Sequence, residues 1–152
     1  MKPYKLALIP AAFMVMATMA SAGVVAPNDV VFESDGAVSQ SLTGVPGDPA
    51  NGRKVFAHRK KGNCLACHKN SDLSEQQFHG EIGPALDGVA KRYDEAHLRG
   101  ILVNSKKTFE GSIMPSFYRL ENGARTMKKF QGKTILTAQE VEDVLAYLMT
   151  LK

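Results

Sequence analysis

The clearest pattern of apolar and polar positions lies near the C-terminus. Thr137 is followed three residues later by Glu140, the spacing of a capping box at the start of a helix. Beyond it, apolar residues recur at helical spacing, at Val141, Val144, Leu145, Leu148 and Leu151. This pattern predicts a helix with one apolar stripe that faces a core. Tyr147 lies beside the stripe, where it can pack against another helix.

The pattern of residues 48–60 predicts a second helix. Asp48 can cap exposed backbone N–H groups, and Pro49 suits the first helical position because its missing donor costs nothing there. Gly52 permits a crossing helix to approach closely, and Phe56 belongs to the apolar face. We expect the C-terminal helix to cross at this point, with its tyrosine against this face.

A third helix is predicted after Asp94, with Leu98, Ile101 and Leu102 on its inner face. Between the helical segments the chain is rich in glycine, and no stretch alternates long enough to predict a strand. These patterns together predict an all-α fold in which long loops connect the helices.

The first 22 residues have the pattern of an export signal. Lys2 and Lys5 precede an apolar stretch over residues 6–19, and Ala-Ser-Ala at 20–22 matches a signal peptidase site. The apolar stretch is shorter than the roughly 20 residues of a membrane-spanning helix. We therefore expect cleavage after Ala22, a periplasmic protein and no stable membrane anchor.

The next segment, 23–47, has short apolar runs but no helical period, which predicts an extended arm. Its apolar residues favour packing on this domain or on a partner over the disorder that is common at chain ends. Residues 48–152 then form the main domain. Removing the leader leaves 130 residues, which is enough for one small domain and not for two.

Charge adds one exclusion. The chain has 19 basic and 15 acidic side chains, and without Lys2 and Lys5 the balance falls to 17 against 15. No dense basic stripe with interleaved aromatic residues is present in the sequence. A net charge near +2 on an exported protein does not indicate nucleic-acid binding.

The chemistry of the chain is concentrated in one pentapeptide, Cys64-Leu65-Ala66-Cys67-His68, which contains both cysteines. C-x-x-C-H is the spacing of covalent haem attachment. Each thiol can add to a haem vinyl group, and the histidine after the second cysteine can then reach the iron as an axial ligand. The motif predicts one haem c per chain, held by Cys64, Cys67 and His68.

Two other kinds of site use paired cysteines. A redox dithiol of the thioredoxin type is expected near a βαβ pattern, which this sequence lacks. A structural zinc site requires four ligands, and the remaining candidates, His58, His79 and His97, are scattered along the chain. The motif and the predicted export favour haem over both.

A low-spin electron carrier needs a second axial ligand. Met114 precedes Pro115 in a loop, away from any predicted helical core, and its soft thioether favours ferrous iron. Met127 is a second candidate, but the two lysines that follow it indicate a wetter setting. Met149 fits packing better than ligation. Met114 is therefore the expected ligand.

The order of these features resembles class I cytochromes c across almost the whole mature domain: helix, C-x-x-C-H, Gly83-Pro84, helix, Met114-Pro115, helix. The resemblance implies a class I cytochrome c-like fold, with helices and long loops around one haem. It also implies that Pro84 supplies a carbonyl to the N–H of the axial imidazole and so fixes the orientation of the ring.

A finer resemblance rests on several segments taken together. They are similar to the SoxX family, the monohaem subunits of SoxAX cytochromes, at residues 52–56, 62–68, 83–84, 92–93, 114–119 and 136–148. This resemblance implies a heterodimer with a SoxA-like haem subunit, which acts in periplasmic thiosulfate oxidation as an L-cysteine S-thiosulfotransferase. Such a complex couples thiosulfate to a cysteine of a sulfur-carrier protein, and the released electrons pass to an acceptor cytochrome.

The residues themselves limit what this chain can do. With both cysteines bound to haem, no thiol remains as a sulfur nucleophile, so the covalent step would belong to the partner. The sequence offers no paired carboxylates, catalytic triad or phosphate-binding loop. The main alternative is a freestanding periplasmic cytochrome c that shuttles electrons. A peroxidase or gas sensor is disfavoured because Met114 would close the sixth position of the iron.

Overall fold

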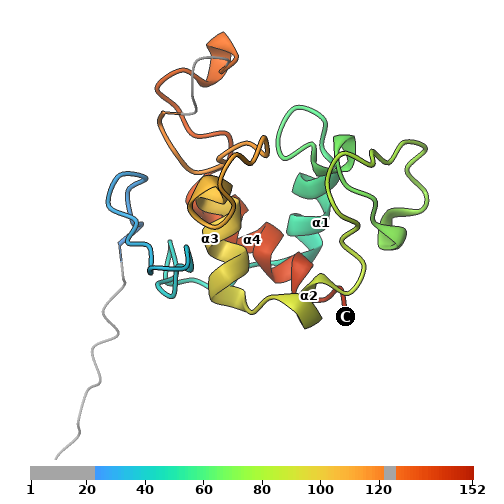
Figure 1. Ribbon diagram of the computed structural model, residues 1–152, viewed down its shortest axis with the longest axis horizontal. Coiled ribbons are helices and arrows are strands. Elements are labelled where there is room, and N and C mark those ends of the chain that lie inside the picture. The colour runs from blue at the N-terminus through green and yellow to red at the C-terminus, as the bar shows by residue number, and fades with distance from the viewer. Residues whose placement is uncertain (1–22, 122–125) are drawn as a thin grey trace, which may run out of the picture.

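The computed structural model describes residues 23–121 and 126–152, and these residues form helices and loops without a strand (Figure 1). The α-helices of the described part are α1 (Pro49–Ala57), α2 (Val89–Arg92), α3 (Glu95–Asn104) and α4 (Ala138–Leu148). Its short 3₁₀ turns are η1 (Cys64–Ala66), η2 (Ser71–Leu73), η3 (Ser105–Lys107) and η4 (Lys128–Phe130). The predicted all-α class is confirmed.

The predicted leader, with its cleavage after Ala22, lies outside the described residues. None of the helices within 23–121 and 126–152 is long and apolar enough to cross a membrane.

Helices α1 and α4 cross at Gly52, as the sequence predicts. A Cβ atom at this glycine would lie 1.9 Å from the carbonyl oxygen of Asp143, so only glycine permits the contact. Beside the crossing, the rings of Phe56 and Tyr147 meet edge to face with their centroids 5.5 Å apart. The crossing therefore joins the first and last helices of the domain.

The ends of these helices follow local signals. The side-chain oxygen of Asp48 accepts the N–H of Ala50, which caps α1. Thr137 and Glu140 form the predicted capping box of α4. Helix α1 ends at Ala57, short of the predicted Lys60, because the next residue adopts an extended backbone conformation.

The arm, residues 23–47, packs against this domain rather than extending from it. Val38 and Leu42 are each only 1% exposed. The Val38 N–H donates to the carbonyl of Ala96 in α3 at 2.9 Å. At Gly100 the arm comes so close that a Cβ atom would lie 2.0 Å from the carbonyl oxygen of Gly36. The arm is thus part of the core although it contains no helix or strand.

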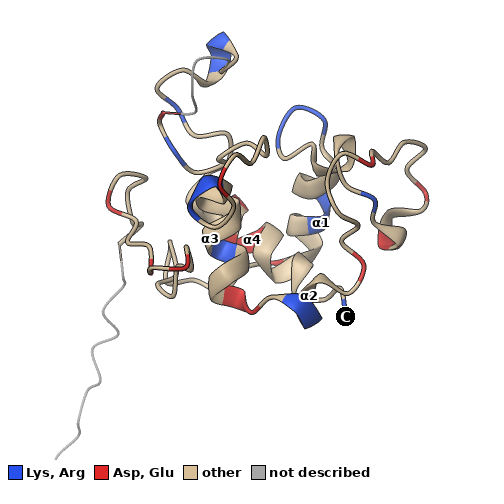
Figure 2. Ribbon diagram, in the orientation of Figure 1, with Lys and Arg blue, Asp and Glu red and all other residues tan. Residues whose placement is uncertain are grey.

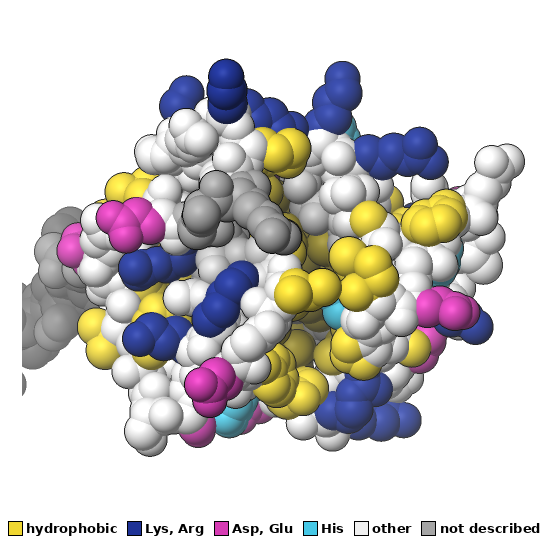
Figure 3. Space-filling view, turned by 45° about the horizontal axis from the view of Figure 1, so that its top comes forward, with side chains coloured by type: hydrophobic (Ala, Val, Ile, Leu, Met, Phe, Trp, Pro, Cys, Tyr) yellow, Lys and Arg dark blue, Asp and Glu magenta, His cyan; other side chains and the backbone are white. Residues whose placement is uncertain are grey.

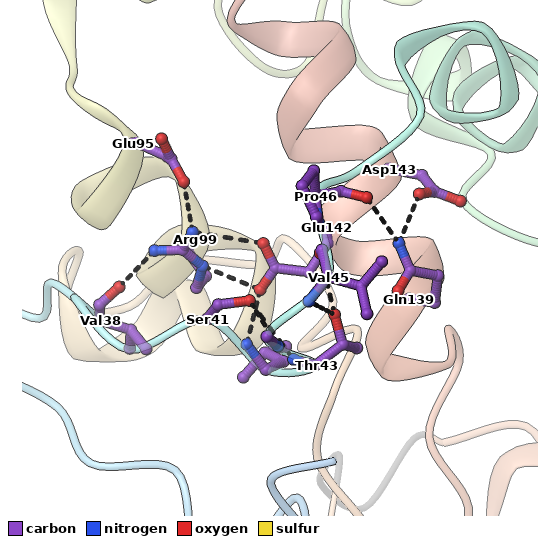
Figure 4. Close-up of polar contacts among 12 residues, drawn as sticks. Val38, Ser41, Thr43, Val45, Pro46, Glu95, Arg99, Gln139, Glu142 and Asp143 are labelled. Carbon is purple, nitrogen blue, oxygen red and sulfur yellow. Dashed lines mark hydrogen bonds and ion pairs between the residues drawn. The ribbon is translucent and has the colours of Figure 1, made fainter. Parts of the chain in front are cut away.

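A buried ion pair fixes the arm to the helices (Figure 4). Arg99 of α3 and Glu142 of α4 are 3% and 4% exposed, and Arg99 Nε lies 3.0 Å from Glu142 Oε1. Arg99 Nη1 donates to the carbonyl of Val38 at 2.9 Å, and Glu142 Oε1 accepts the N–H of Leu42 at 2.7 Å. Each charge therefore bonds both its partner and the backbone of the arm.

Asp143 makes a second junction, between α4 and the start of α1. Its carboxylate accepts the Asp48 N–H at 2.8 Å, the Asn51 side-chain amide at 2.6 Å and the Gln139 side-chain amide at 2.9 Å. Desolvation raises the pKa of Asp143, but these hydrogen bonds outweigh it and lower the pKa below its usual value.

Replacing Glu142 by glutamine is expected to lower the free energy of unfolding by about 3 kcal/mol, because buried Arg99 would keep only the exposed Glu95 as a counter-charge. Chemical denaturation of the haem-loaded protein measures this change. Glu75→Gln is the matched control, since Glu75 pairs with Arg53 at the surface and its loss should change little. Equal effects of the two substitutions would contradict the anchoring role of the buried pair.

Candidate haem site

A cavity of about 680 Å³ opens between the segment that follows α1 and the loop that follows α3. Its wall is largely apolar and includes Phe56, Leu98, Leu102, Phe117 and Leu148. Figure 3 shows the opening as a hollow in which hydrophobic side chains gather. The cavity thus lies in the middle of the core, with one side open to solvent.

The two cysteines line this cavity on one turn. Cys64 begins η1, and the N–H groups of Cys67 and His68 both return to the Cys64 carbonyl, at 3.1 and 2.9 Å. Asn63 allows the turn by adopting a left-handed backbone conformation with φ of 50°. The turn therefore brings both sulfur atoms and the imidazole to the same opening.

His68 is held by the segment that contains Pro84. The His68 Nδ1 atom lies 2.7 Å from the Pro84 carbonyl oxygen, so Nδ1 carries the proton and donates it there. The other ring nitrogen, Nε2, then has a free lone pair for a metal. Gly83 is needed for this packing, because a Cβ atom there would lie 2.4 Å from His68 Cε1.

Met114 lines the same cavity from the opposite side, on the loop after α3 (Figure 1). The residue is partly buried and packs against the hydrophobic core. Met127 also lines the cavity, but 60% of it is exposed. Burial thus favours Met114 over Met127 as an iron ligand. Met149 lies apart from this cavity and packs against the core, as expected.

The other histidines have different partners. His58 Nδ1 accepts the Lys60 N–H, and His79 Nε2 donates to the Leu73 carbonyl. His97 lies between Asp94 and Asp35, and hydrogen bonding to Asp94 raises its pKa. In the described part of the chain, no group of three or more His, Cys, Asp and Glu side chains is arranged to hold a metal ion.

The environment of Cys64 does not suit a redox dithiol. Desolvation raises the pKa of the Cys64 thiol to about 12, whereas redox-active cysteines have a lowered pKa that keeps them as thiolates. Nothing in the packing of the turn supplies a positive charge close enough to reverse this shift. The cysteines are placed for attachment to a group in the cavity.

The rim of the cavity combines basic and apolar side chains. Arg59, Lys60, Lys61 and Lys129 contribute to its lining, and no acidic residue does so among those described. Figure 2 shows basic segments in the loop that follows α1 and at η4. Ile82 and Ile113 stand at the same opening and are 68% and 81% exposed. No signal in the sequence marks this rim, because basic residues near a helix end ordinarily face water.

The cavity fits a haem bound through the C-x-x-C-H motif. It places two thiols and an imidazole with a free nitrogen at one wall, a thioether at the other, and apolar side chains between them. The fold and the site together define a c-type cytochrome.

Comparison with known proteins gives the family. Residues 49–152 match the cytochrome c family, and the chain belongs to it. It is 45% identical to a chain in the crystal structure of SoxXA from P. pantotrophus, with a TM-score of 0.79. That match covers 86% of this chain and 99% of the other chain, which confirms the resemblance to SoxX. A member of this family binds haem c covalently, so the cofactor predicted from the motif is also confirmed.

A second solved structure is more distant. The c-type cytochrome SorU from Sinorhizobium meliloti is 27% identical, with a TM-score of 0.44, over 68% of this chain and 88% of that chain. No curated protein sequence matches this chain.

Gly83→Ala is expected to displace the His68 ring, because the added methyl group would overlap it. The electron paramagnetic resonance spectrum of the ferric haem protein reports the orientation of the axial imidazole and should shift. Gly132→Ala is the control, since it strains a backbone with φ of +67° but meets no atom within 4 Å. A Gly83→Ala spectrum identical to that of the natural protein would show that the ring does not depend on this packing.

Proposed function

We propose that this chain is the monohaem electron-transfer subunit of a SoxAX-type complex that oxidises thiosulfate. The observation that carries the proposal is its 45% identity, over 99% of that chain's length, to a chain of SoxXA. The main domain, residues 48–152, encloses the haem cavity. The arm, residues 23–47, packs against α3 and α4 and hydrogen-bonds to Arg99 and Glu142.

In this proposal, Cys64 and Cys67 would bind the haem covalently, and His68 and Met114 would hold its iron. The bound haem supplies a one-electron couple. Pro84 holds the proton on Nδ1 of His68, which fixes the ring and raises its basicity as a ligand. The apolar wall excludes water, and Met114 favours the reduced state, so both tune the potential.

The covalent chemistry takes place on a SoxA-like partner. A carrier-protein thiol and thiosulfate, S₂O₃²⁻, join through a new sulfur–sulfur bond, with loss of one proton and two electrons. This chain contributes no nucleophile, because its two cysteines are used by haem. Its part in the L-cysteine S-thiosulfotransferase reaction is to take up the electrons one at a time and pass them to an acceptor cytochrome.

We place the complex in the periplasm, with the leader removed after Ala22. The pattern of residues 1–22 supports export. Export also suits the cofactor, because free paired thiols would tend to oxidise to a disulfide in that compartment unless haem bonds them first.

In this proposal, the acceptor cytochrome docks at the basic and apolar rim of the haem cavity. Basic side chains around an apolar patch favour a partner with an acidic surface, and such attraction speeds encounter without tight binding. Transfer to the acceptor should therefore slow as ionic strength rises.

A freestanding electron shuttle remains the second candidate, and one observation favours it. An apolar arm that needed another chain to cover it would support a subunit role, because a shuttle gains little from such an extension. In the structure, however, the arm buries Val38 and Leu42 on its own domain, so it does not require a partner.

Co-purification separates the two candidates. The protein expressed with its own leader is expected to retain a cysteine-bearing haem subunit after a high-salt wash, since subunit interfaces resist screening. Thiosulfate with the carrier protein should then reduce its haem in the complex and not in the isolated chain. A monomer that exchanges electrons with equal rates whether or not the partner is present would contradict the subunit assignment.

The axial ligand has its own test. Met114→Ala should abolish the near-infrared methionine–iron charge-transfer band of the ferric protein and open the ferrous iron to carbon monoxide. Met127→Ala is the matched control, because it removes the other methionine at the cavity and should leave the band unchanged. The reverse pattern would move the ligand assignment to Met127.

A further inference from the structure

The end of α3 binds the backbone of the loop that carries Met114. The Ser105 hydroxyl donates to the Met114 carbonyl oxygen at 3.0 Å, and the ammonium of Lys106 donates to the same oxygen. Asn104 extends the contact, because its side-chain oxygen accepts the Ser116 hydroxyl at 2.9 Å. Three consecutive residues thus bind the loop on both sides of Pro115.

We propose that Ser105 and Lys106 are positioning residues that hold the Met114 sulfur at the iron, an inference that rests on the proposed ligation by Met114. Neither side chain lines the cavity. Both side chains bind the Met114 carbonyl oxygen, and we call these two hydrogen bonds the clamp.

The local backbone explains why this carbonyl matters. Pro115 has no N–H to donate, and the Met114 N–H bonds only weakly, to the Ser112 hydroxyl at 3.3 Å. The Met114 carbonyl is therefore the main polar attachment of the loop at the ligand itself. Before it, the Ile113 side chain is 81% exposed and adds little packing to the loop.

After Met114 the chain is firmly attached to α3. The Phe117 N–H donates to the Leu102 carbonyl at 3.0 Å. The Phe117 carbonyl oxygen accepts the N–H groups of Ile135 and Leu136, each at 3.0 Å. Ser105 itself is fully buried. The clamp therefore joins the loop that carries Met114 to the rigid end of α3. Such a support fixes the position of a metal ligand.

An external ligand can bind the iron only when the Met114 sulfur moves away. We expect the backbone at Met114 to move with it, which breaks the bonds of its carbonyl to Ser105 and Lys106. Weakening the clamp should therefore make displacement easier. The affinity of the ferric protein for imidazole measures this opening directly, and a residue that supports only global stability would not change it.

We would titrate the ferric haem protein with imidazole and follow the loss of the methionine–iron band. Ser105→Ala should raise the affinity for imidazole about 5-fold, the effect of one neutral hydrogen bond. Lys106→Met should raise this affinity about 10-fold, because methionine has no N–H donor and the bond lost is that of a charged donor. Lys107→Met is the matched control, since Lys107 approaches the Phe32 ring and not Met114, and the affinity of this variant for imidazole should stay at the natural value.

The outcomes separate this inference from the proposed function. If the natural protein shows the band but all variants bind imidazole alike, the positioning role of Ser105 and Lys106 is wrong, and ligation by Met114 stands. If the natural protein lacks the band, both are wrong. Lys106 lies at the surface, so Lys106→Met decides the matter even where Ser105→Ala fails to fold.

Discussion

The close crossing of α1 and α4 is the contact on which the rest of the structure depends. With Gly52 against the Asp143 carbonyl, the helices approach nearer than any side chain would allow. Phe56 and Leu148, one from each helix, then form part of the cavity wall. The chain passes from α1 through residues 58–63 into the turn of Cys64 and Cys67, so the crossing also helps to set where the haem-binding motif enters the cavity.

Much of this arrangement follows from short-range patterns in the sequence. The capping box at Thr137, the cap at Asp48 and the C-x-x-C-H motif are local signals, and each acts within a few residues. The placement of Gly52 at a helix crossing also follows, because a glycine inside an apolar helix face has few other uses.

Long-range polar pairing could not be predicted in the same way. Arg99 and Glu142 are far apart in the sequence, and charged residues on helices usually face water. Only the packing of the arm buries them and gives each a backbone partner. The contact of Ser105 with Met114 is hidden for the same reason, since a serine at a helix end looks like an ordinary solvated residue.

The site is therefore built from two parts with different supports. One wall, with the cysteines and His68, is fixed by a tight turn and the Pro84 carbonyl. The other wall, with Met114, is fixed by the end of α3, and α3 is itself tied to the arm through Arg99. This arrangement gives the arm a structural role in supporting the methionine side of the site, even though it lies on the far side of the helices.

We propose that His68 and Met114 both bind the iron of one haem. X-ray absorption at the iron edge of the purified ferric protein distinguishes this ligand set from others, because sulfur and nitrogen neighbours scatter differently. We expect a single sulfur ligand in addition to the nitrogens of the porphyrin and the imidazole. A spectrum with nitrogen or oxygen ligands alone would contradict it.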